Sequence, residues 1–258
     1  DKIILIDNKE TFGLALEEAG GKIRGQKGTT VKLTIARDGR NELKDYQIIR
    51  EAIDVPTVVW EMKAEMLAYL RVSYFNENTG GEFDKAVGQI LARQPKGIVL
   101  DMRSNPGGYL DRSVRVASEW IPDGVIVREK FVDEGEREYL SEGSHRFANI
   151  PTVVLVDEGT ASGAEIVAGA LQDYGVAKVV GKKTYGKGSV QDFEPLPDGS
   201  ALKLTVATWY TPKNRQIDKT GIAPDISIET MFVPQDEKEP EGARRDVGLE
   251  KALELLKK

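Results

Sequence analysis

The stretch from Asp157 to Gln191 combines a serine, a lysine and a glutamine at positions that could support acyl transfer. Ser162 lies where a short β-branched run, residues 151–156, gives way to apolar residues at helical spacing. The exposed N–H groups and the dipole at the start of a helix favour negative charge, including a developing oxyanion. Ser162 is therefore a candidate nucleophile, followed by Lys187 and Gln191.

Ser162 also fits a purely structural role. Glu165 follows three residues later, and Ser-x-x-Glu is the capping-box pattern, in which the hydroxyl only satisfies a backbone donor. On this segment alone the capping interpretation is favoured. A nucleophile needs a base that takes its proton, so the decision depends on the rest of the chain.

The choice of base is narrow because the chain contains no cysteine and a single histidine. His145 lies in the polar stretch EGSHRFAN and is predicted to be a surface-loop residue. Lysine can replace histidine when burial lowers its pKa. Lys187 stands between Gly186 and Gly188, and these glycines should let the backbone approach closely and turn the lysine inward.

Lys187 has a competing interpretation in nucleotide binding. Residues 181–188, GKKTYGKG, nearly match the phosphate-binding loop GxxxxGK[ST]. Gly188 stands where that loop needs a hydroxyl for magnesium, and the following residues contain Pro195 and Pro197 and predict a strand and turn, not the required helix. Nucleotide binding is disfavoured.

A second segment that could take part in catalysis lies upstream, in GIVLDMRSNPGGYLD. Residues 98–100 form a short apolar strand, and the Asn-Pro-Gly-Gly sequence at 105–108 is a strong turn signal. Alone it predicts only a tight turn. Two glycines after a buried strand can also present bare backbone N–H groups, as an oxyanion hole requires.

The three motifs DMRSNPGG, TASGAE and TYGKGSVQ, in this order, resemble those of the C-terminal processing peptidases, also called tail-specific proteases. The resemblance implies that Ser162 is the nucleophile, Lys187 the general base and Gln191 the residue that orients the lysine. It also implies an oxyanion hole formed by the backbone N–H groups of Gly108 and Gly163. The implied activity is that of a serine endopeptidase acting near protein C-termini through an acyl-enzyme.

The serine motif departs from the family's S-A-S-A-S-E pattern at Thr160, Gly163 and Ala164. A glycine at 163 is expected to make the loop more flexible. Because an oxyanion donor is a backbone N–H group, Gly163 can still supply it. The resemblance implies no cofactor and no metal.

Composition excludes several other classes of protein. A net charge of −6 gives no sign of a nucleic-acid partner, and no apolar run is long enough to span a membrane. Without cysteine the chain has neither disulfides nor thiolate metal sites. The start, DKIILID, has no initiator methionine or signal peptide, which suggests processing. The resemblance implies a bacterial, extracytoplasmic location, periplasmic, envelope-bound or secreted.

Alternating strand and helix patterns predict a layered α/β fold. The resemblance refines residues 55–232 to a crotonase-like layered protease core. Residues 1–54 show a strand, helix, strand pattern similar to the C-terminal half of a PDZ domain, so a partial PDZ-like segment is expected there. The strands that would capture a substrate's C-terminal carboxylate would precede Asp1. Residues 233–258 are predicted as a polar linker and a C-terminal helix.

Partners are implied by these segments. The expected substrates are proteins or peptides with accessible apolar C-termini. Arg71 occupies the place of an arginine that couples the PDZ domain to the active site in the family, although an ordinary surface arginine fits equally well. The last helix has an apolar face that must pack on the core or on another subunit, as in a homo-oligomer.

Two functions from other classes remain open on the sequence. The same fold supports non-hydrolytic members, so the chain could be a peptide-binding scaffold protein. An acyl-CoA enzyme of the crotonase type would also use paired backbone donors, in that case for an enolate. The acyl-CoA alternative does not explain Ser162, Lys187 and Gln191 together.

Overall fold

A computed structural model describes residues 1–37, 42–52, 55–132, 135–234 and 244–257. The chain divides into two compact units, Asp1–Val55 and Pro56–Lys258. Each unit has its own hydrophobic cluster. In the described part of the chain, no helix is both long enough and apolar enough to span a membrane.

The unit Asp1–Val55 is a small antiparallel sheet with one helix. Its strand order is β2-β1-β3-β4. Its elements are β1 (Lys2–Ile6), β2 (Lys9–Glu10), α1 (Leu16–Ile23), β3 (Thr30–Ala36) and β4 (Lys44–Ile49). The alternating residues Val31 and Leu33 pack with Ile6 in the core of this unit. The expected strand, helix and strand are present, with two further strands, and the likeness to half a PDZ domain stays a prediction.

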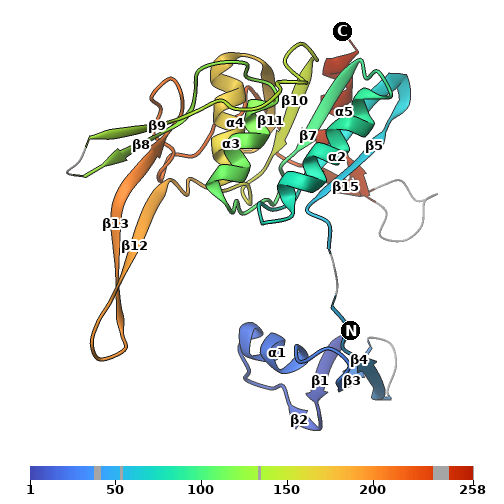
Figure 1. The fold of residues 1–258 in the computed structure, drawn as a ribbon. Helices are drawn as coiled ribbons and strands as arrows, with labels where there is room; N and C mark the ends of the chain where they lie inside the picture. Colours follow the sequence, from blue (N-terminus) through green and yellow to red (C-terminus); the bar gives the residue numbers. More distant parts are fainter. Residues whose placement is uncertain (38–41, 53–54, 133–134, 235–243, 258) are drawn as a thin grey trace. The chain divides into compact units, whose positions relative to one another are not determined.

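The unit Pro56–Lys258 is built on a six-stranded sheet of order β14-β11-β10-β7-β6-β5 (Figure 1). All neighbours pair in parallel except β5 and β6. The strands are β5 (Val58–Met62), β6 (Leu67–Val72), β7 (Gly97–Asp101), β10 (Thr152–Val156), β11 (Ala177–Gly181) and β14 (Ile226–Ser227). The central strands β7 and β10 are buried along their whole length, as expected for a parallel sheet covered on both faces.

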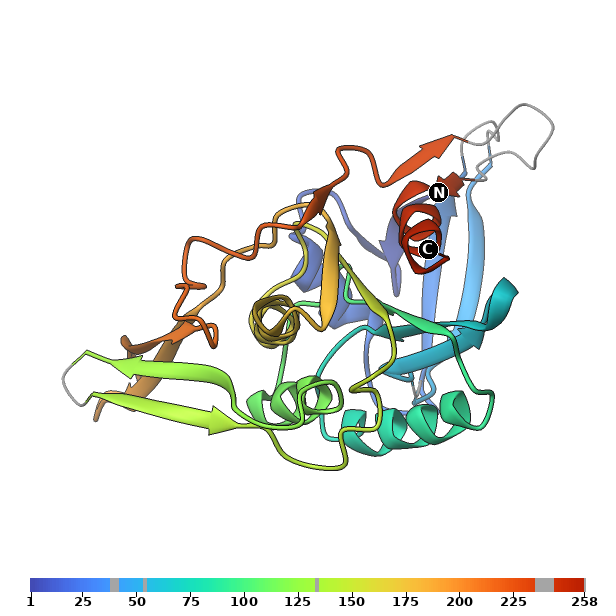
Figure 2. The same ribbon diagram turned by 90° about the horizontal axis from the view of Figure 1, so that it is seen from above.

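Helices cover both faces of this sheet (Figure 2). They are α2 (Thr79–Leu91), α3 (Leu110–Ser118), α4 (Gly163–Tyr174) and α5 (Val247–Leu256), with a short 3₁₀ helix η1 (Ala64–Met66). Along β7, Ile98 and Leu100 belong to the large core that includes α2, α3 and α4, whereas Val99 belongs to the cluster packed on α5. Strand alternation thus separates the two faces.

A second, antiparallel sheet of order β12-β13-β8-β9 lies beside the layered part. It consists of β8 (Val125–Phe131), β9 (Glu136–Leu140), β12 (Ser189–Pro195) and β13 (Ala201–Tyr210). The hairpin of β12 and β13 projects from the unit (Figure 1). Part of the turn expected between β8 and β9, residues 133–134, lies outside the described residues.

The predicted polar linker before the last helix is partly wrong. Residues 235–243 lie outside the described residues, but β15 (Phe232–Pro234) and β16 (Arg244–Asp246) pair on either side of them. Strands of three residues are too short for a period-two pattern to be recognised in a sequence. The helix itself, α5, is confirmed, and its apolar face packs on the sheet of the same unit.

Candidate active site

The three motifs converge because they follow three neighbouring parallel strands. The Asn-Pro-Gly-Gly turn follows β7, the Ser162 loop follows β10, and the Lys187 segment follows β11. In parallel sheets the carboxyl ends of the strands lie at one edge, where ligands of α/β folds usually bind. The order β11-β10-β7 therefore puts the serine motif in the middle.

Ser162 lies at the N-terminus of α4 with backbone angles φ 55° and ψ −120°. A non-glycine residue in this region is strained, and such residues gather at functional sites. Its carbonyl oxygen accepts the first helical hydrogen bonds, from the N–H groups of Glu165 at 2.8 Å and Ile166 at 3.1 Å. The helix ends at Gly175, which adopts the left-handed conformation.

The Asn-Pro-Gly-Gly turn is held by the buried side chain of Asn105. Its Nδ2 donates to the Val72 carbonyl oxygen at 2.8 Å, and its Oδ1 accepts the Gly107 N–H at 2.8 Å. Its backbone carbonyl oxygen accepts the Ala161 N–H at 2.8 Å. One residue thus joins the turn to β6 and to the residue before Ser162.

Only glycine fits at position 108. Gly108 has φ 137°, and a Cβ atom there would lie 2.0 Å from the Phe75 carbonyl oxygen. The contact is close because Phe75 N–H donates to the Gly107 carbonyl oxygen and Tyr109 N–H donates to that of Phe75, both at 2.9 Å. The turn is therefore locked against the segment that follows β6.

The turn also packs directly on the serine. A Cβ atom at Gly107 would lie 2.6 Å from Ser162 Cβ and 2.8 Å from the backbone nitrogen of Gly163. Within the described residues, neither the Gly108 N–H nor the Gly163 N–H donates a hydrogen bond. The structure therefore brings together Ser162 and the two N–H groups that were expected to be oxyanion donors.

Glu165 is fully buried and connects the serine motif to the lysine motif. Its Oε2 accepts the backbone N–H groups of Ser162 at 2.9 Å and Lys187 at 2.8 Å. Its Oε1 accepts the Thr184 hydroxyl at 2.5 Å and the Gly186 N–H at 2.7 Å. The carboxylate also lies in the first turn of α4, where the helix dipole favours negative charge.

Sequence reasoning assigned Glu165 only to a capping box. The carboxylate half of that motif is present, since Glu165 accepts the Ser162 N–H. Its bonds to residues 184–187, some twenty positions away, carry no local sequence signal. A glutamate in a helix that is otherwise buried and apolar is the one feature that could have indicated such a role.

Lys187 differs from its expectation. Gly188 does let the backbone come close, because a Cβ there would lie 2.2 Å from the Asp218 nitrogen. The lysine is nevertheless exposed, so the expected inward turn is wrong in this conformation. Among the described residues no hydrogen bond joins Lys187 Nζ to Ser162 Oγ, although their backbones share Glu165 Oε2. Gly188 packs against the backbone of residues 217–218.

Gln191 lies on β12, at an irregularity in its pairing with β13. The register shifts between Val190 and Gln191, so that Gln191 pairs with Thr205. The side chain of Gln191 is exposed, and no hydrogen bond to Lys187 is formed within the described part of the chain. After Lys187 the chain continues as a strand, so the helix that a phosphate-binding loop needs is absent there.

Arg71 and a buried charged cluster lie at the strand ends. Arg71 on β6 is paired in register with Asp101, the last residue of β7. Asp101 is fully buried, binds Arg103, and accepts the Tyr69 hydroxyl at 2.7 Å. Burial, the Asp101 charge and the hydrogen bond to Asp101 together raise the pKa of Tyr69 to about 12. His145 is elsewhere, with Nδ1 2.7 Å from the Ser118 carbonyl oxygen.

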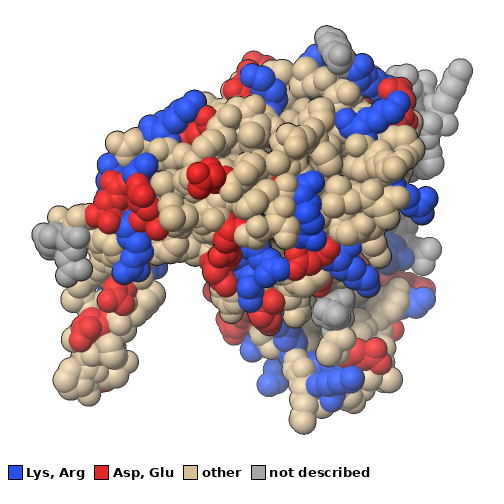
Figure 3. All heavy atoms as spheres, turned by 45° about the horizontal axis from the view of Figure 1, so that its top comes forward, with Lys and Arg blue, Asp and Glu red and all other residues tan. Residues whose placement is uncertain are grey.

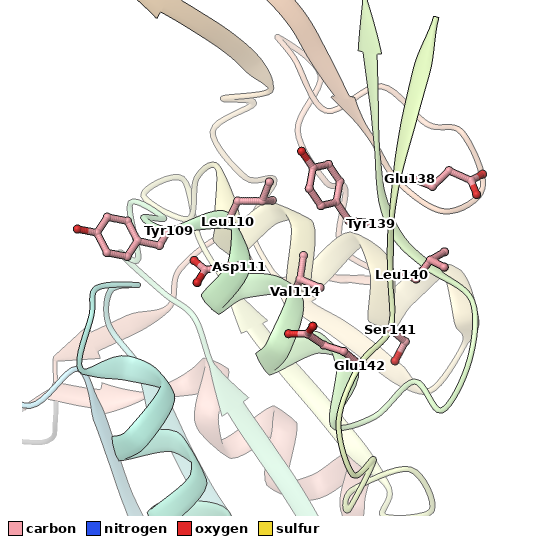
Figure 4. Close-up of a pocket in the computed structure, with 9 residues that line it drawn as sticks. All are labelled: Tyr109, Leu110, Asp111, Val114, Glu138, Tyr139, Leu140, Ser141 and Glu142. Atoms are coloured by element: carbon pink, nitrogen blue, oxygen red, sulfur yellow. The ribbon is translucent and has the colours of Figure 1, made fainter.

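A pocket of about 700 Å³ begins at the residue after Gly108 (Figure 4). Leu110 and Val114 extend from α3 toward the strand that carries Tyr139, while the Glu138 carboxylate points away. The charged residues that line it are all acidic. Its full lining is Tyr109, Leu110, Asp111, Val114, Glu138, Tyr139, Leu140, Ser141 and Glu142. The described residues contain no group of three His, Cys, Asp or Glu side chains placed to hold a metal ion.

The chain is similar to known proteins over most of its length. The chain is 38% identical over 229 residues to the carboxy-terminal processing protease CtpA of Bacillus subtilis, covering 89% of this chain and 49% of that protein. It is 37% identical over 264 residues to a carboxyl-terminal-processing protease of Picosynechococcus, covering 99% of this chain and 62% of that protein. The chain thus spans about half to three fifths of the length of these relatives.

Solved structures give the same picture. The photosystem II D1 C-terminal processing protease matches with a TM-score of 0.66 and 29% identity, over 92% of this chain and 65% of that one. A putative S41 protease from Bacteroides fragilis shares the fold, with a TM-score of 0.58 and 17% identity over 88% of this chain and 65% of that one. The family model for peptidase family S41 matches residues 66–228, which include all three motifs. The chain belongs to peptidase family S41.

Proposed function

We propose that this chain is a serine endopeptidase that cleaves proteins at or near their C-termini through a Ser-Lys dyad. The observation that carries the proposal is the packing of the Asn-Pro-Gly-Gly turn on the serine, with Gly107 against Ser162 and the N–H groups of Gly108 and Gly163 unpaired beside it. Two free backbone donors next to a strained serine at a helix start suit an acyl-transfer site. The names of the curated relatives support the C-terminal direction of cleavage.

The proposed reaction proceeds in two halves. Lys187 Nζ, as the neutral amine, takes the proton of Ser162 Oγ while that oxygen bonds to the scissile carbonyl carbon. The carbonyl oxygen becomes an oxyanion and accepts hydrogen bonds from the Gly108 and Gly163 N–H groups. The ammonium then protonates the leaving amine as the C–N bond breaks. Water then attacks the acyl carbon while Lys187 accepts its proton, and Lys187 returns that proton to Ser162 Oγ as the ester C–O bond breaks and the acid is released.

The base must move before this reaction can occur. Lys187 is exposed, and it makes no hydrogen bond to Ser162 in the described conformation. Active-site segments often align only when a ligand binds. The proposed sequence is that substrate binding brings Lys187 Nζ onto Ser162 Oγ. Gln191 would hold the amine there by hydrogen bonding.

The proposed substrates present apolar residues near the cleavage site. The pocket that starts beside Gly108 has an apolar floor of Leu110, Val114 and Tyr139. An extended peptide advances about 3.3 Å per residue, so a substrate whose carbonyl lies at Gly108 reaches this pocket within one or two residues. The acidic side chains at its rim would disfavour acidic substrates.

The proposed function also assigns roles to the segments of the chain and a location to the protein. Residues 1–54 would form the partial PDZ-like segment, residues 55–232 a crotonase-like core, and Arg71 would couple the two. The protein would act outside the bacterial cytoplasm, in the envelope or beyond it, as a monomer or a homo-oligomer. The bacterial origin of the curated relatives supports this setting. Cell fractionation with an antibody to the chain would test the location.

The central test compares Ser162→Ala, Lys187→Ala and the unchanged chain on an unfolded protein with an apolar C-terminus, with the products identified by mass spectrometry. Both substitutions should reduce cleavage by at least about 10⁴-fold, because each removes a group that the chemistry needs. Lys183→Ala is the matched control, since Lys183 is an exposed lysine on the same segment. It should retain full activity.

The alternative of a non-hydrolytic scaffold has one supporting observation: within the described residues, the exposed Lys187 side chain makes no hydrogen bond to Ser162. It predicts that the unchanged chain binds the same protein without cutting it, and that Ser162→Ala binds equally well. Cleavage that persists in Ser162→Ala would contradict the proposed nucleophile. Cleavage that persists in Lys187→Ala, in a folded protein, would contradict the proposed base.

A further inference from the structure

Arg103 lies in the loop between β7 and the Asn-Pro-Gly-Gly turn. It is almost enclosed, with only 6% of its side chain exposed. Its Nε donates to Asp101 Oδ1 at 2.9 Å, its Nη2 donates to Asp101 Oδ2 at 2.5 Å, and its backbone N–H donates to Asp101 Oδ1 at 2.9 Å. Arg103 and Asp101 thus fold the chain back on itself where the loop begins.

The other side of the guanidinium is held from the far end of the chain. Arg103 Nη1 donates to Asp246 Oδ1 and Nη2 to Asp246 Oδ2, both at 2.8 Å, across 143 residues. Paired parallel hydrogen bonds of this kind fix both the position and the plane of the guanidinium. Asp246 belongs to β16, directly before α5.

The C-terminal segment also encloses the guanidinium with apolar groups. The ring of Phe232, on β15, lies under it at 5.2 Å. A Cβ atom at Gly248 would lie 3.4 Å from Arg103 Nη1, so the first turn of α5 packs against the same group. Arg103 is therefore held on one side by Asp101 and on the other by the three C-terminal residues Phe232, Asp246 and Gly248.

The charges make this arrangement interdependent. Burial lowers the pKa of Arg103, but the hydrogen bonds to Asp101 and Asp246 outweigh it and raise the pKa overall, so the guanidinium is charged. Loss of the Asp246 carboxylate would leave two N–H directions of a buried cation without acceptors. A buried charge with an unmet donor moves toward water or toward another acceptor. Movement of Arg103 would carry its backbone N–H away from Asp101.

The loop that follows has little slack to absorb such a movement. Ser104 has φ 56°, and its N–H and hydroxyl both bond to the Asp157 carboxylate, at 2.7 and 3.0 Å. The next residues run through Asn105 to Gly108, which is locked against Phe75. A shift at Arg103 is therefore passed to the Gly108 N–H along a short segment that is hydrogen-bonded at Ser104, Asn105 and Gly107.

We propose that Asp246 is a positioning residue for the oxyanion hole: it holds Arg103, which with Asp101 fixes the start of the loop that presents the Gly108 N–H. This inference rests on the proposed function, in which that loop supplies an oxyanion donor. It makes the strand β16 and the helix α5 part of the catalytic unit, although they lie outside the segment 66–228 that matches the family model.

Asp246 has a second task that the test must separate. It is also the N-cap of α5, where its Oδ1 accepts the Leu249 N–H at 2.9 Å. Serine is a good N-cap but cannot hold a guanidinium with two parallel bonds. Asp246→Ser therefore keeps the cap and removes the clamp. Asp246→Glu keeps the charge with a longer reach.

The experiment measures kcat and KM for the unchanged chain and for Asp246→Ser, Asp246→Glu and Arg245→Gln. Arg245 is the matched control, because it makes an exposed ion pair with Glu250 next to the same helix. Asp246→Ser should lower kcat by roughly 10- to 100-fold, as small misplacements of catalytic groups do. KM should change less than about twofold, since no substrate contact is lost. Asp246→Glu should recover part of kcat, and Arg245→Gln should match the unchanged chain.

Hydrogen exchange of the peptide covering residues 102–109 gives a readout that does not need activity. Exchange should be faster in Asp246→Ser than in the unchanged chain and in Arg245→Gln. Unchanged exchange in that peptide, or a kcat for Asp246→Ser equal to that of Arg245→Gln, overturns the proposal. If the unchanged chain does not hydrolyse peptides, the proposed function fails. The exchange measurement still decides the positioning role: faster exchange in Asp246→Ser supports it, and equal exchange overturns it.

Discussion

Two regions of the proposed active site are built in opposite ways. The donor frame, which we define as the loop 102–108 with the first turn of α4, is buried at Met102, Arg103, Asn105, Gly107 and in that helical turn, and it is held by hydrogen bonds at Asn105, Gly107 and Glu165. The base arm, defined as Lys187 with the hairpin of β12 and β13, is exposed along most of β12 and the first half of β13. Under the proposed mechanism, the nucleophile and the oxyanion donors are thus fixed in advance, whereas the base is not.

The difference shows where ligand binding can act. A preorganised donor frame needs no rearrangement during the reaction, which is the condition for strong electrostatic stabilisation. The base arm exposes Phe193, Leu202 and Leu204, and Figure 3 shows the far end of this projecting hairpin as largely uncharged. Under the proposed mechanism, alignment of Lys187 is therefore the step that a bound ligand would complete.

The largest effect is expected from Glu165→Gln, which weakens the hydrogen bonds that hold the donor frame. In Glu165→Gln an NH₂ group must face two of the four donors that the carboxylate now accepts. The free energy of unfolding should fall by about 3 kcal/mol, because buried donors lose a charged acceptor. Activity should fall more than 100-fold, since the backbones of Ser162 and Lys187 lose their common partner. Urea unfolding and peptide hydrolysis measure the two effects.

Glu158→Gln is the control for Glu165→Gln. Glu158 is an exposed glutamate near the same loop, paired with Lys182 at 2.7 Å. Its loss should change the free energy of unfolding by less than about 0.5 kcal/mol. If Glu165→Gln behaved like this control, the donor frame would not depend on the buried carboxylate.

A change in the base arm should affect activity without affecting stability. Gln191→Ala removes an exposed side chain that makes no hydrogen bond in the described part of the chain. We expect kcat to fall about tenfold, because Lys187 loses the group proposed to orient it, with the free energy of unfolding unchanged within about 0.5 kcal/mol. Steady-state kinetics and thermal unfolding of one preparation test both. A joint loss of activity and stability would place Gln191 in the frame instead.

Beside the donor frame, the hydrogen bond of Tyr69 to Asp101 should make the stability depend on pH. Its pKa is raised from 10.0 to about 12, so the folded state holds a proton that the unfolded state releases first. This contribution is complete below about pH 10 and is lost as the pH rises toward 12. Its size is on the order of 1 kcal/mol, because the ring is only half-buried and solvent screens it.

Tyr69→Phe tests this dependence. The variant loses the hydrogen bond to Asp101 at every pH, so the informative quantity is the change in the free energy of unfolding between pH 8 and pH 11. That change should be smaller in Tyr69→Phe than in the unchanged chain. Equal changes in both proteins would mean that Tyr69 does not hold its proton in the folded state.

The smallest effect is expected at the far end of the base arm. Phe193→Ser with Leu204→Ser replaces two exposed apolar side chains on β12 and β13. The free energy of unfolding should change by less than about 0.5 kcal/mol per site, and hydrolysis of a short peptide should be unaffected. Circular dichroism during heating and a peptide assay suffice. A large loss of stability would show that the hairpin is packed more firmly than its exposure implies.

Much of this architecture could be predicted from local patterns. The β-branched run at 151–156 predicted a strand, and the apolar spacing after Ser162 predicted α4. The Asn-Pro-Gly-Gly turn after β7 was predicted as well, with its two glycines at positive φ. These features depend on residues close together in the chain, and for that reason periodicity and turn chemistry find them.

The missed features depend on long-range contacts. The bonds of Glu165 to residues 184–187 and of Asp246 to Arg103 join positions about 20 and 143 residues apart, and neither leaves a local pattern. The inward turn of Lys187 was wrong, because its side chain is exposed even though Gly188 lets the backbone approach Asp218 closely. A sequence motif can name a catalytic residue without fixing its side-chain direction.

The shared Oε2 atom of Glu165 has a consequence for how the chain can vary in length. Ser162 and Lys187 are separated along the chain by all of α4 and β11, yet in space their backbones are each one hydrogen bond from the same atom. Residues inserted at the turn after Gly175 would lengthen the path between them without altering that reference point. We therefore expect the number of residues between the two motifs to tolerate change, whereas the glutamate must stay three positions after the serine.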